Sequence, residues 1–287
     1  MRSVPAPCAL PFPHARALLA AAWLAAAAAS AAAAPVTPAP PGGPTAAGVD
    51  ERLADGDRLY GLGQLREASA AYAGAVGVAP TSLPALLRLV RAESEWGETE
   101  SGDAQRRTWA SAVEHARAAV RLAPDSADTH AWLAVALGRE ALHEGPRTKL
   151  AMSREIKSEV DRALELNPNL ARAWHVLAMW NVKIAGLNFV ERMAAHAVLG
   201  GVPPGASDAN AERAFEKAIA LEPDHVLHRL EYGRLLRDEK RWADARAQLE
   251  KAVSLPPTSD ALDPRYQEEA RALLARLPRP AASGARP

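Results

Sequence analysis

Two imidazoles and one carboxylate recur at intervals of three residues in the last third of the chain: His225, His228 and Glu231. On a helix His228 and Glu231 would share one face, and imidazole with carboxylate is a ligand set for divalent cations. His225, however, falls in the turn after Pro223, and no further ligand is evident in the sequence. We therefore interpret these residues as the start of a helix, and the sequence predicts no metal site and no cofactor.

Motifs of catalysis do not occur in this sequence. It has no G-x-S-x-G, no phosphate-binding glycine loop and no H-E-x-x-H, and Cys8 is its single cysteine. Carboxylates are frequent, but they have basic neighbours at helical spacing, such as Glu250 with Arg246, which is typical of solvated helix faces. The sequence therefore predicts no enzyme and no catalytic residues. A hydrolase that uses a long insertion as a lid is the third and weakest alternative.

The first 34 residues have the pattern of a secretory signal peptide. Arg2 and Arg16 precede an apolar run, residues 17–29, and residues 29–31 form an A-x-A cleavage pattern. The alternative is an uncleaved anchor, because residues 17–34 just reach the length that spans a bilayer. With its bias toward Ala, Arg and Pro, the sequence predicts an exported protein of the bacterial periplasm or cell envelope.

The charge balance of the chain limits which classes of partner it can be expected to bind. The whole chain has 34 basic and 34 acidic groups, and removal of residues 1–34 leaves 32 basic and 34 acidic groups, a net charge of −2. A nucleic-acid partner normally requires a basic face, so none is expected. Because Cys8 lies in the targeting segment, the mature chain has no disulfide, thiolate metal site or thiol nucleophile.

One short phrase, Ala–aliphatic–any–aliphatic–any–Pro, occurs five times and is called the repeated phrase below. Proline stops a helix, and this phrase is typical of the end of the second helix of a tetratricopeptide repeat. Its copies are residues 75–80, 119–124, 163–168, 218–223 and 252–257. The sequence therefore predicts an all-α, tetratricopeptide-like helical-hairpin solenoid, in which each hairpin buries its apolar face on its neighbours.

The repeats are unequal in length. Successive copies of the phrase are 44, 44, 55 and 34 residues apart, and the ordinary period is about 34. The extra residues are expected as a polar loop at 96–103, a break at 143–148 and a larger insertion at 186–206. Residues 187–199 of that insertion have helical amphipathic spacing. We expect this helix to cover apolar surface of the solenoid. The alternatives are that it forms a lid over the groove or that it contacts a membrane.

These observations give a domain organisation. The segments are a signal peptide or anchor (1–34), a Pro/Gly-rich linker (35–49), the solenoid (50–277) and a disordered tail (278–287). The solenoid units lie near 50–80, 81–124, 125–168, 169–223 and 224–257, followed by a C-terminal capping helix at 263–277.

The first helices of stacked hairpins line a concave groove. Lys183 and Arg237 would meet the carboxylates of an extended peptide there, whereas the Lys–Asn pair of chaperone-tail clamps is replaced by His175 and Met179. Indexing from the repeated phrase places in this groove Tyr60, His130, His175, Met179, Lys183, Arg234 and Arg237.

Four stretches carry a likeness to a known family: 163–180, 189–206 with its E-R-M-A and G-G-V-P-P, 211–223, and 252–277. From about Ala119 onward the chain resembles the regulator of microtubule dynamics protein family, and its first repeat is generic. The resemblance implies an all-helical scaffold without catalytic residues. Animal members are linked to microtubules and to contacts between mitochondria and other membranes, but no motif here marks a tubulin site.

The sequence thus predicts a non-catalytic, exported repeat scaffold that binds a protein or peptide through its groove. The alternative is a membrane-anchored tethering or envelope-assembly component, which leaves membrane proximity open. No small-molecule substrate is evident.

Overall fold

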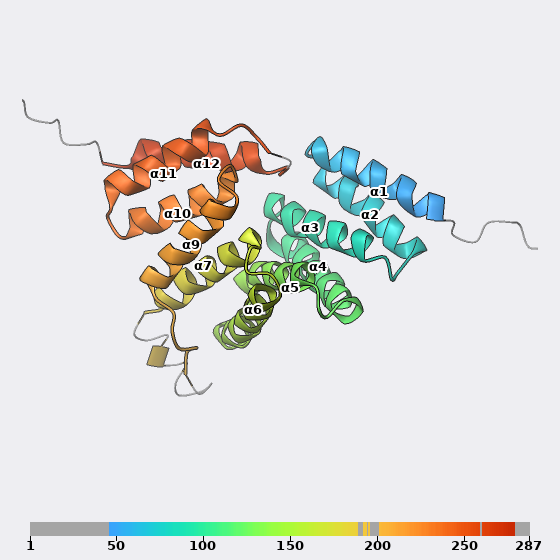
Figure 1. The fold of residues 1–287 in the computed structure, drawn as a ribbon, viewed down its shortest axis with the longest axis horizontal. Coiled ribbons are helices and arrows are strands. Elements are labelled where there is room, and N and C mark those ends of the chain that lie inside the picture. The colour runs from blue at the N-terminus through green and yellow to red at the C-terminus, as the bar shows by residue number, and fades with distance from the viewer. Residues whose placement is uncertain (1–45, 189–191, 194, 196–200, 259, 279–287) are drawn as a thin grey trace, which may run out of the picture. The chain divides into compact units, whose positions relative to one another are not determined.

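The computed structural model describes residues 46–188, 192–193, 195, 201–258 and 260–278 (Figure 1). The predicted signal segment, most of the linker and nearly all of the tail therefore lie outside the described residues. Helix α1 begins at Ala46, inside the stretch interpreted as linker, because the last proline of that stretch is Pro44 and the single glycine after it, Gly48, is tolerated within the helix. Among the described helices, none is both long and apolar enough to cross a membrane.

The described part of the chain is built from α-helices and one 3-10 turn, and it contains no strand. The all-α prediction is confirmed. The helices are α1 (Ala46–Gly61), α2 (Leu65–Val78), α3 (Leu83–Thr99), α4 (Gly102–Leu122), α5 (Ala127–Glu140), α6 (Pro146–Leu166), α7 (Ala171–Ala185), α9 (Asp208–Leu221), α10 (Val226–Asp238), α11 (Trp242–Ser254) and α12 (Asp263–Arg276), with the 3-10 turn η1 (Ala141–His143) after α5.

Helical hairpins stack in chain order. The pairs α1/α2, α3/α4, α5/α6, α7/α9 and α10/α11 each pack on the next pair, and α12 packs on α10 and α11 as a cap. The alanine that opens each copy of the repeated phrase is completely buried, because the two helices of a pair approach closely there: Ala75, Ala119, Ala163, Ala218 and Ala252. The predicted solenoid with a C-terminal capping helix is thus confirmed.

The second pair is longer than a standard hairpin because its helices are extended. Helix α3 continues to Thr99 and α4 begins at Gly102, so the interpretation of residues 96–103 as a polar loop is wrong. The cause is packing: the Trp109 ring donates a hydrogen bond of 3.1 Å to a main-chain carbonyl of α3. A Cβ at Gly97 would lie 2.2 Å from Trp109 Nε1, so only glycine permits this close contact.

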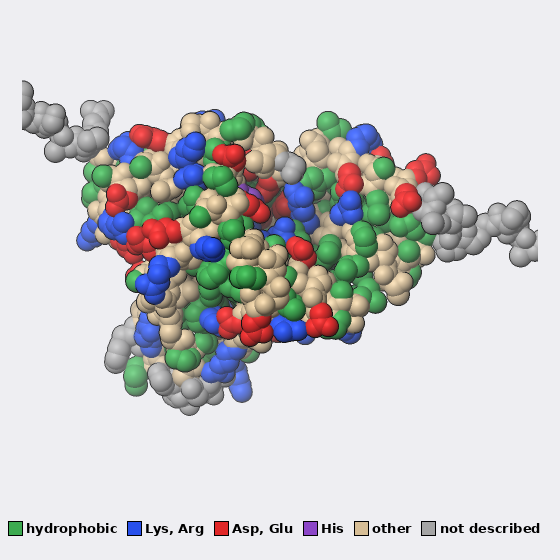
Figure 2. All heavy atoms as spheres, in the orientation of Figure 1, with side chains coloured by type: hydrophobic (Ala, Val, Ile, Leu, Met, Phe, Trp, Pro, Cys, Tyr) green, Lys and Arg blue, Asp and Glu red, His purple; other side chains and the backbone are tan. Residues whose placement is uncertain are grey.

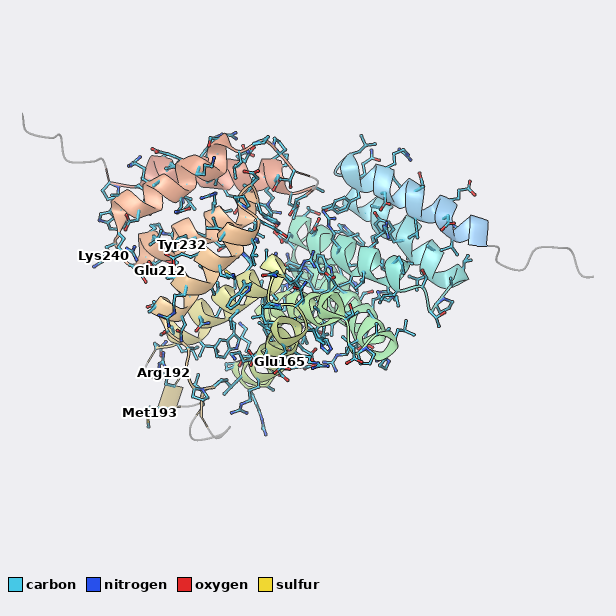
Figure 3. All side chains as sticks on the ribbon, in the orientation of Figure 1. Glu165, Arg192, Met193, Glu212, Tyr232 and Lys240 are labelled. Atoms are coloured by element: carbon cyan, nitrogen blue, oxygen red, sulfur yellow. The ribbon has the colours of Figure 1, made fainter. Side chains whose placement is uncertain are left out.

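The large insertion after α7 is hydrogen-bonded to the solenoid at two described residues, Arg192 and Gly201. Arg192, labelled in Figure 3, donates to the carbonyl oxygens of Ile184 (3.2 Å) and Ala185 (2.7 Å), which lie in the last turn of α7. On the other side, Arg154 of α6 donates to the Gly201 carbonyl at 2.7 Å. The predicted amphipathic helix at 187–199 falls mostly outside the described residues.

The C-terminal segment contacts the first repeats directly. Arg265 of α12 donates to the Glu98 main-chain carbonyl at 2.5 Å, and the Tyr266 hydroxyl donates to Glu98 Oε1 at 3.1 Å. Leu262 and Tyr266 belong to one apolar cluster with Leu89 of α3 and other residues of α1 to α3. Segments about 170 residues apart in the chain are therefore packed together.

Candidate functional site

Ionisable side chains from the first helices, from the turn between α9 and α10 and from the loop before α12 gather in one hollow, called here the inner polar cluster. Figure 2 shows acidic, basic and histidine side chains in this hollow, between the α10 side and the α3 side. On α3 and α10 these residues recur every three or four positions, so each helix presents one polar stripe. The members are Tyr60, Arg91, Glu95, Glu98, Arg139, His175, Glu222, His225, His228, Glu231, Arg234 and Asp260.

One half of the cluster is organised around the buried carboxyl group of Glu95. The Tyr60 hydroxyl donates to Glu95 Oε2 at 2.5 Å, and Arg91 Nε donates to Glu95 Oε1 at 3.2 Å. The Arg91 guanidinium also lies 4.0 Å above the Tyr60 ring. Burial, followed by the nearby Asp260 charge, raises the pKa of Glu95 to about 8, against the opposing effect of Arg91. Glu95 therefore holds a proton near neutral pH.

Ion pairs connect the neighbouring repeats. Arg139 of α5 pairs with Glu98 of α3. On α10, Arg234 donates to Glu231 at 2.7 Å and also pairs with Glu269 of α12. Burial raises the pKa of Glu231, although Arg234 and other basic groups act in the opposite direction. The cluster thus joins helices of the second, third, fifth and capping units through charged groups.

Three histidines of the cluster form a stack. The His225 and His228 ring centroids are 4.2 Å apart and 4° from parallel, and His175 of α7 stacks on His228 at 4.8 Å. Burial lowers the pKa of His228 to about 4 and also lowers the pKa of His175. Both imidazoles are therefore neutral near pH 7. Their Nδ1 atoms are 3.1 Å apart, so one ring donates an N–H hydrogen bond to the other.

The structure brings together only part of the groove set expected from the sequence. Tyr60, His175 and Arg234 belong to the inner polar cluster and already have partners within the chain. His130 lies elsewhere: its Nδ1 is 2.5 Å from a Glu159 oxygen, and it lines a separate hollow of about 350 Å³ beside α6.

The other expected groove residues differ in how accessible they are to a binding partner. Met179 is half-buried and packs on the main apolar cluster. Lys183, one turn later, is exposed and makes no hydrogen bond or ion pair within the described part of the chain, although its charge acts on Glu231. Arg237 pairs with its chain neighbour Asp238 at 2.7 Å.

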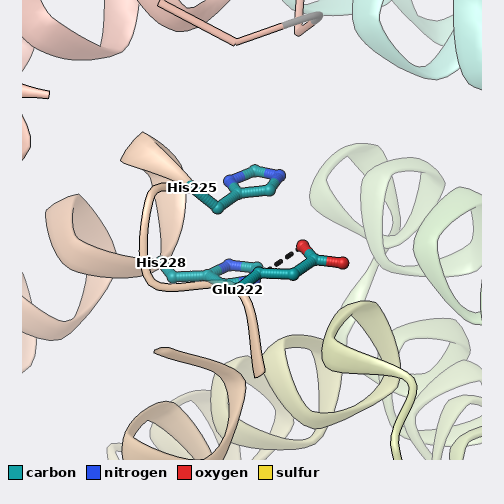
Figure 4. Close-up of side chains that lie close together, drawn as sticks. All are labelled: Glu222, His225 and His228. Carbon is teal, nitrogen blue, oxygen red and sulfur yellow. Dashed lines mark ion pairs between the residues drawn. The ribbon is translucent and has the colours of Figure 1, made fainter. Parts of the chain in front are cut away.

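Sequence reasoning missed several members of the cluster. Arg91, Glu95 and Glu98 recur at helical spacing on the first helix of the second unit, and that spacing was a usable signal. The sequence did not place Asp260 in this cluster, because its position depends on where the loop before α12 folds. The three residues noted for their spacing in the sequence, His225, His228 and Glu231, do not meet. Glu231 turns to Arg234, and the carboxylate that approaches His225 and His228 belongs to Glu222 (Figure 4).

Comparison with solved structures identifies the repeat type. A thermophilic tetratricopeptide-repeat protein of Thermus thermophilus superposes with a TM-score of 0.56 and 22% sequence identity, covering 77% of this chain and 98% of the other. Identity at this level shows the fold, which is that of a tetratricopeptide-repeat protein.

Sequence comparison identifies the family. Regulator of microtubule dynamics protein 3 of Rattus norvegicus is 31% identical over 173 residues. The matched region covers 60% of this chain but only 36% of that relative's length. Regulator of microtubule dynamics protein 1 of Caenorhabditis elegans is 28% identical over 189 residues, covering 66% of this chain and 83% of that relative. The model of Regulator of microtubule dynamics protein 1-3 matches residues 50–278, so the likeness includes the first repeat, which the sequence interpretation took as generic. The chain belongs to the regulator of microtubule dynamics protein family.

Proposed function

We propose that this chain is a non-catalytic repeat scaffold that binds a protein or peptide partner on the face of its first helices. The tetratricopeptide-repeat fold supports the general role, because stacked helical pairs present extended binding surfaces. The observation that carries the site is Lys183, an exposed cation beside the inner polar cluster that has no hydrogen-bond or ion-pair partner within the described residues. Arg139 and Arg234 are, in contrast, already paired with carboxylates, and Arg91 donates a hydrogen bond to Glu95.

The chemistry of this surface indicates what the partner offers. Met179 precedes Lys183 by one helical turn, so a thioether and an ammonium lie side by side on α7. A segment with an apolar side chain next to a carboxylate fits this pair. The proposal does not include chaperone tails, because the Lys–Asn clamp pair is replaced by His175 and Met179.

A charge reversal tests this site. The full chain and a Lys183→Glu variant are used to capture partners from an envelope extract, with Lys217→Glu, an exposed lysine on the second helix α9, as the matched control. We expect Lys183→Glu to lose a captured protein that both the parent chain and the control retain. If the captured set is the same for all three chains, the proposed face does not bind the partner.

The proposal also places the protein in a bacterial envelope, after cleavage within residues 1–34. Its support is the sequence pattern of Arg2, Arg16, the apolar run and the A-x-A site. Mass spectrometry of the mature N-terminus tests it: a first residue near position 32 is expected. An intact Met1 in the membrane fraction would instead favour the anchored tethering component.

Tubulin is not part of the proposal, although the relatives' names refer to microtubules. This chain spans 36% of the rat relative's length, and its N-terminus resembles a bacterial export signal. We expect the purified chain to stay in the supernatant when microtubules are sedimented, and cosedimentation would contradict the envelope role.

A further inference from the structure

We propose that a hollow between α6, α7 and α9 binds the carboxyl-terminal residue of a partner chain, when that residue has an apolar side chain. Helix α7 packs against both α6 and α9 (Figure 1), and the hollow between them, called here the tryptophan hollow, has a volume of about 270 Å³. The side chains in its lining that carry the argument are Lys157, Trp174, Leu177, Trp180, Asn210 and Arg213.

The tryptophan hollow and the surface around Lys183 lie on different sides of α7. Leu177 and Asn181 line the hollow and are one helical turn apart, whereas Met179 and Lys183 form a second stripe of the same kind. The step from Leu177 to Met179 is two residues, or about 200° around the helix. The two stripes are therefore nearly opposite, and this proposal does not depend on the binding face proposed above.

The indole rings give the tryptophan hollow an apolar wall. The Trp174 ring N–H donates to the Pro168 carbonyl and the Trp180 ring N–H to the Ser153 carbonyl, each at 2.8 Å. Because both polar edges are bonded within the chain, the rings offer hydrocarbon surface to a ligand. An apolar side chain that enters the hollow is removed from water, which favours binding.

The polar part of the lining is cationic. Arg213 is exposed and donates to the side-chain oxygen of Asn210, but it has no carboxylate partner within the described part of the chain. Lys157 donates to Asp161 at 2.6 and 2.8 Å, and its Nζ lies 5.5 Å from the centroid of the Trp180 ring. No acidic side chain is among the described residues that line the hollow. The guanidinium of Arg213 is therefore available for a charge-assisted bond to an anionic group.

Size and charge together select a chain terminus. Small-molecule sites usually enclose about 300–1,000 Å³, so a hollow of about 270 Å³ suits a single residue. A carboxyl-terminal residue carries an apolar side chain and a carboxylate on one Cα atom. An internal Asp or Glu needs a second, neighbouring residue to supply the apolar part. The terminal residue is thus the unit that fills the hollow and pairs with Arg213.

Side-chain amides hold the rim of the hollow on the side of the insertion. Asn181 is 3% exposed; its Nδ2 donates to the Leu177 carbonyl at 2.8 Å, and its oxygen accepts from the Ser207 N–H at 3.2 Å. Asn210 Nδ2 donates to the Gly205 carbonyl at 2.6 Å. These bonds fix the rim before a ligand arrives, which lowers the entropy lost on binding.

Fluorescence anisotropy with labelled peptides tests the site on the full chain. The probes are fluorescein-Gly-Ser-Gly-Ser-Leu with a free terminal carboxylate, the same peptide as its terminal amide, and a free-acid peptide that ends in Gly. We expect the free-acid Leu peptide to bind saturably. The amide should bind about 10–100-fold more weakly because it loses a charge-assisted hydrogen bond. The Gly peptide should be weaker by a similar factor, about 10–100-fold, because it buries no side chain.

Variants of the lining assign the two parts of the ligand. Arg213→Gln should weaken binding of the free-acid Leu peptide about tenfold and leave the amide unchanged, so the ratio between the two affinities falls. Trp174→Ala should weaken binding of both peptides, because it removes apolar wall. Lys217→Gln, at an exposed position one turn after Arg213 and outside the lining, is the matched control and should keep the parent affinities.

Helical circular dichroism shows whether each variant folds, and the exposed Arg213→Gln keeps the test valid if Trp174→Ala unfolds. Three results would each overturn the proposal: no saturable binding of the free-acid Leu peptide, equal affinities of the parent chain for acid and amide, or a parent-like ratio of these affinities in Arg213→Gln.

Discussion

The backbone N–H of Ala261 donates a hydrogen bond of 3.3 Å to the hydroxyl of Tyr60, which lies 201 residues earlier in the chain. The same hydroxyl donates to the buried Glu95, so one oxygen atom connects α1, α3 and the loop before α12. A solenoid is held mainly by contacts between neighbouring repeats, and this bond instead joins the first unit to the end of the last. The stability of the two ends is therefore coupled through the inner polar cluster.

Replacing Tyr60 by Phe should destabilise the protein by about 1–3 kcal/mol, because the Glu95 carboxyl and the Ala261 N–H would each lose a partner in a buried place. Urea unfolding followed by circular dichroism measures the change. Tyr72→Phe is the matched control, since its hydroxyl bonds to the half-exposed Asp57, and it should cost less. Equal losses for both variants would show that the connection to Ala261 contributes nothing.

The buried carboxyl of Glu95 predicts a pH dependence of stability. Its folded pKa of about 8 exceeds the unfolded value of about 4.5, so at intermediate pH the folded state holds a proton that the unfolded chain has released. The free energy of unfolding should therefore fall as the pH rises from about 5 to 8, by at most about 1.4 kcal/mol per pH unit from this group. The titratable and charged groups that act with it are Tyr60, Arg91, Arg139, Asp260 and Tyr266.

Glu95→Gln tests this dependence, because the amide has the same shape and does not titrate. We expect its unfolding free energy, measured by urea titration at pH 5, 6, 7 and 8, to fall less steeply than that of the parent chain. Glu250→Gln, at an exposed position on α11, should retain the parent slope. A parent-like slope in Glu95→Gln would mean that another group causes the dependence.

Gly97 and Gly138 are both helical glycines, but alanine should have opposite effects at the two positions. A Cβ at Gly97 would lie 2.2 Å from Trp109 Nε1, so Gly97→Ala should cost about 1–3 kcal/mol through overpacking. A Cβ at Gly138 would meet nothing within 4 Å, and Gly138→Ala should stabilise α5 by about 0.5–1 kcal/mol. Thermal unfolding of the two variants measures both signs. A neutral Gly97→Ala would contradict the role assigned to the Trp109 contact.

Two tryptophans of α7 should differ in their contribution to stability. Trp180 is 5% exposed and donates to the Ser153 carbonyl at 2.8 Å, so Trp180→Ala should cost about 3–5 kcal/mol. Trp174 is only half-buried, although it donates to the Pro168 carbonyl at 2.8 Å, and Trp174→Ala should cost less. Chemical denaturation of both variants decides the order, and a larger loss for Trp174→Ala would reverse our assignment of the packing.

The sequence determined the helical pairs because the signals for them are local. The repeated phrase places alanine where helices cross and proline where the second helix must stop, since proline has no N–H to continue it. The loop at 96–103 was misjudged because its polar residues indicated exposure, whereas packing of Trp109 on Gly97 keeps the chain helical there.

Only the tertiary structure decided which polar residues meet. Tyr60 and Ala261 are brought together by the stacking of every repeat between them. No pattern in the sequence predicts that these two residues lie within hydrogen-bond distance. The choice of Glu222 over Glu231 beside His225 and His228 depends on the path of one turn, because Glu231 turns to the cation Arg234 on its own helix. Helix ends follow from the chemistry of neighbouring residues, whereas the inner polar cluster follows from the packing of the whole array.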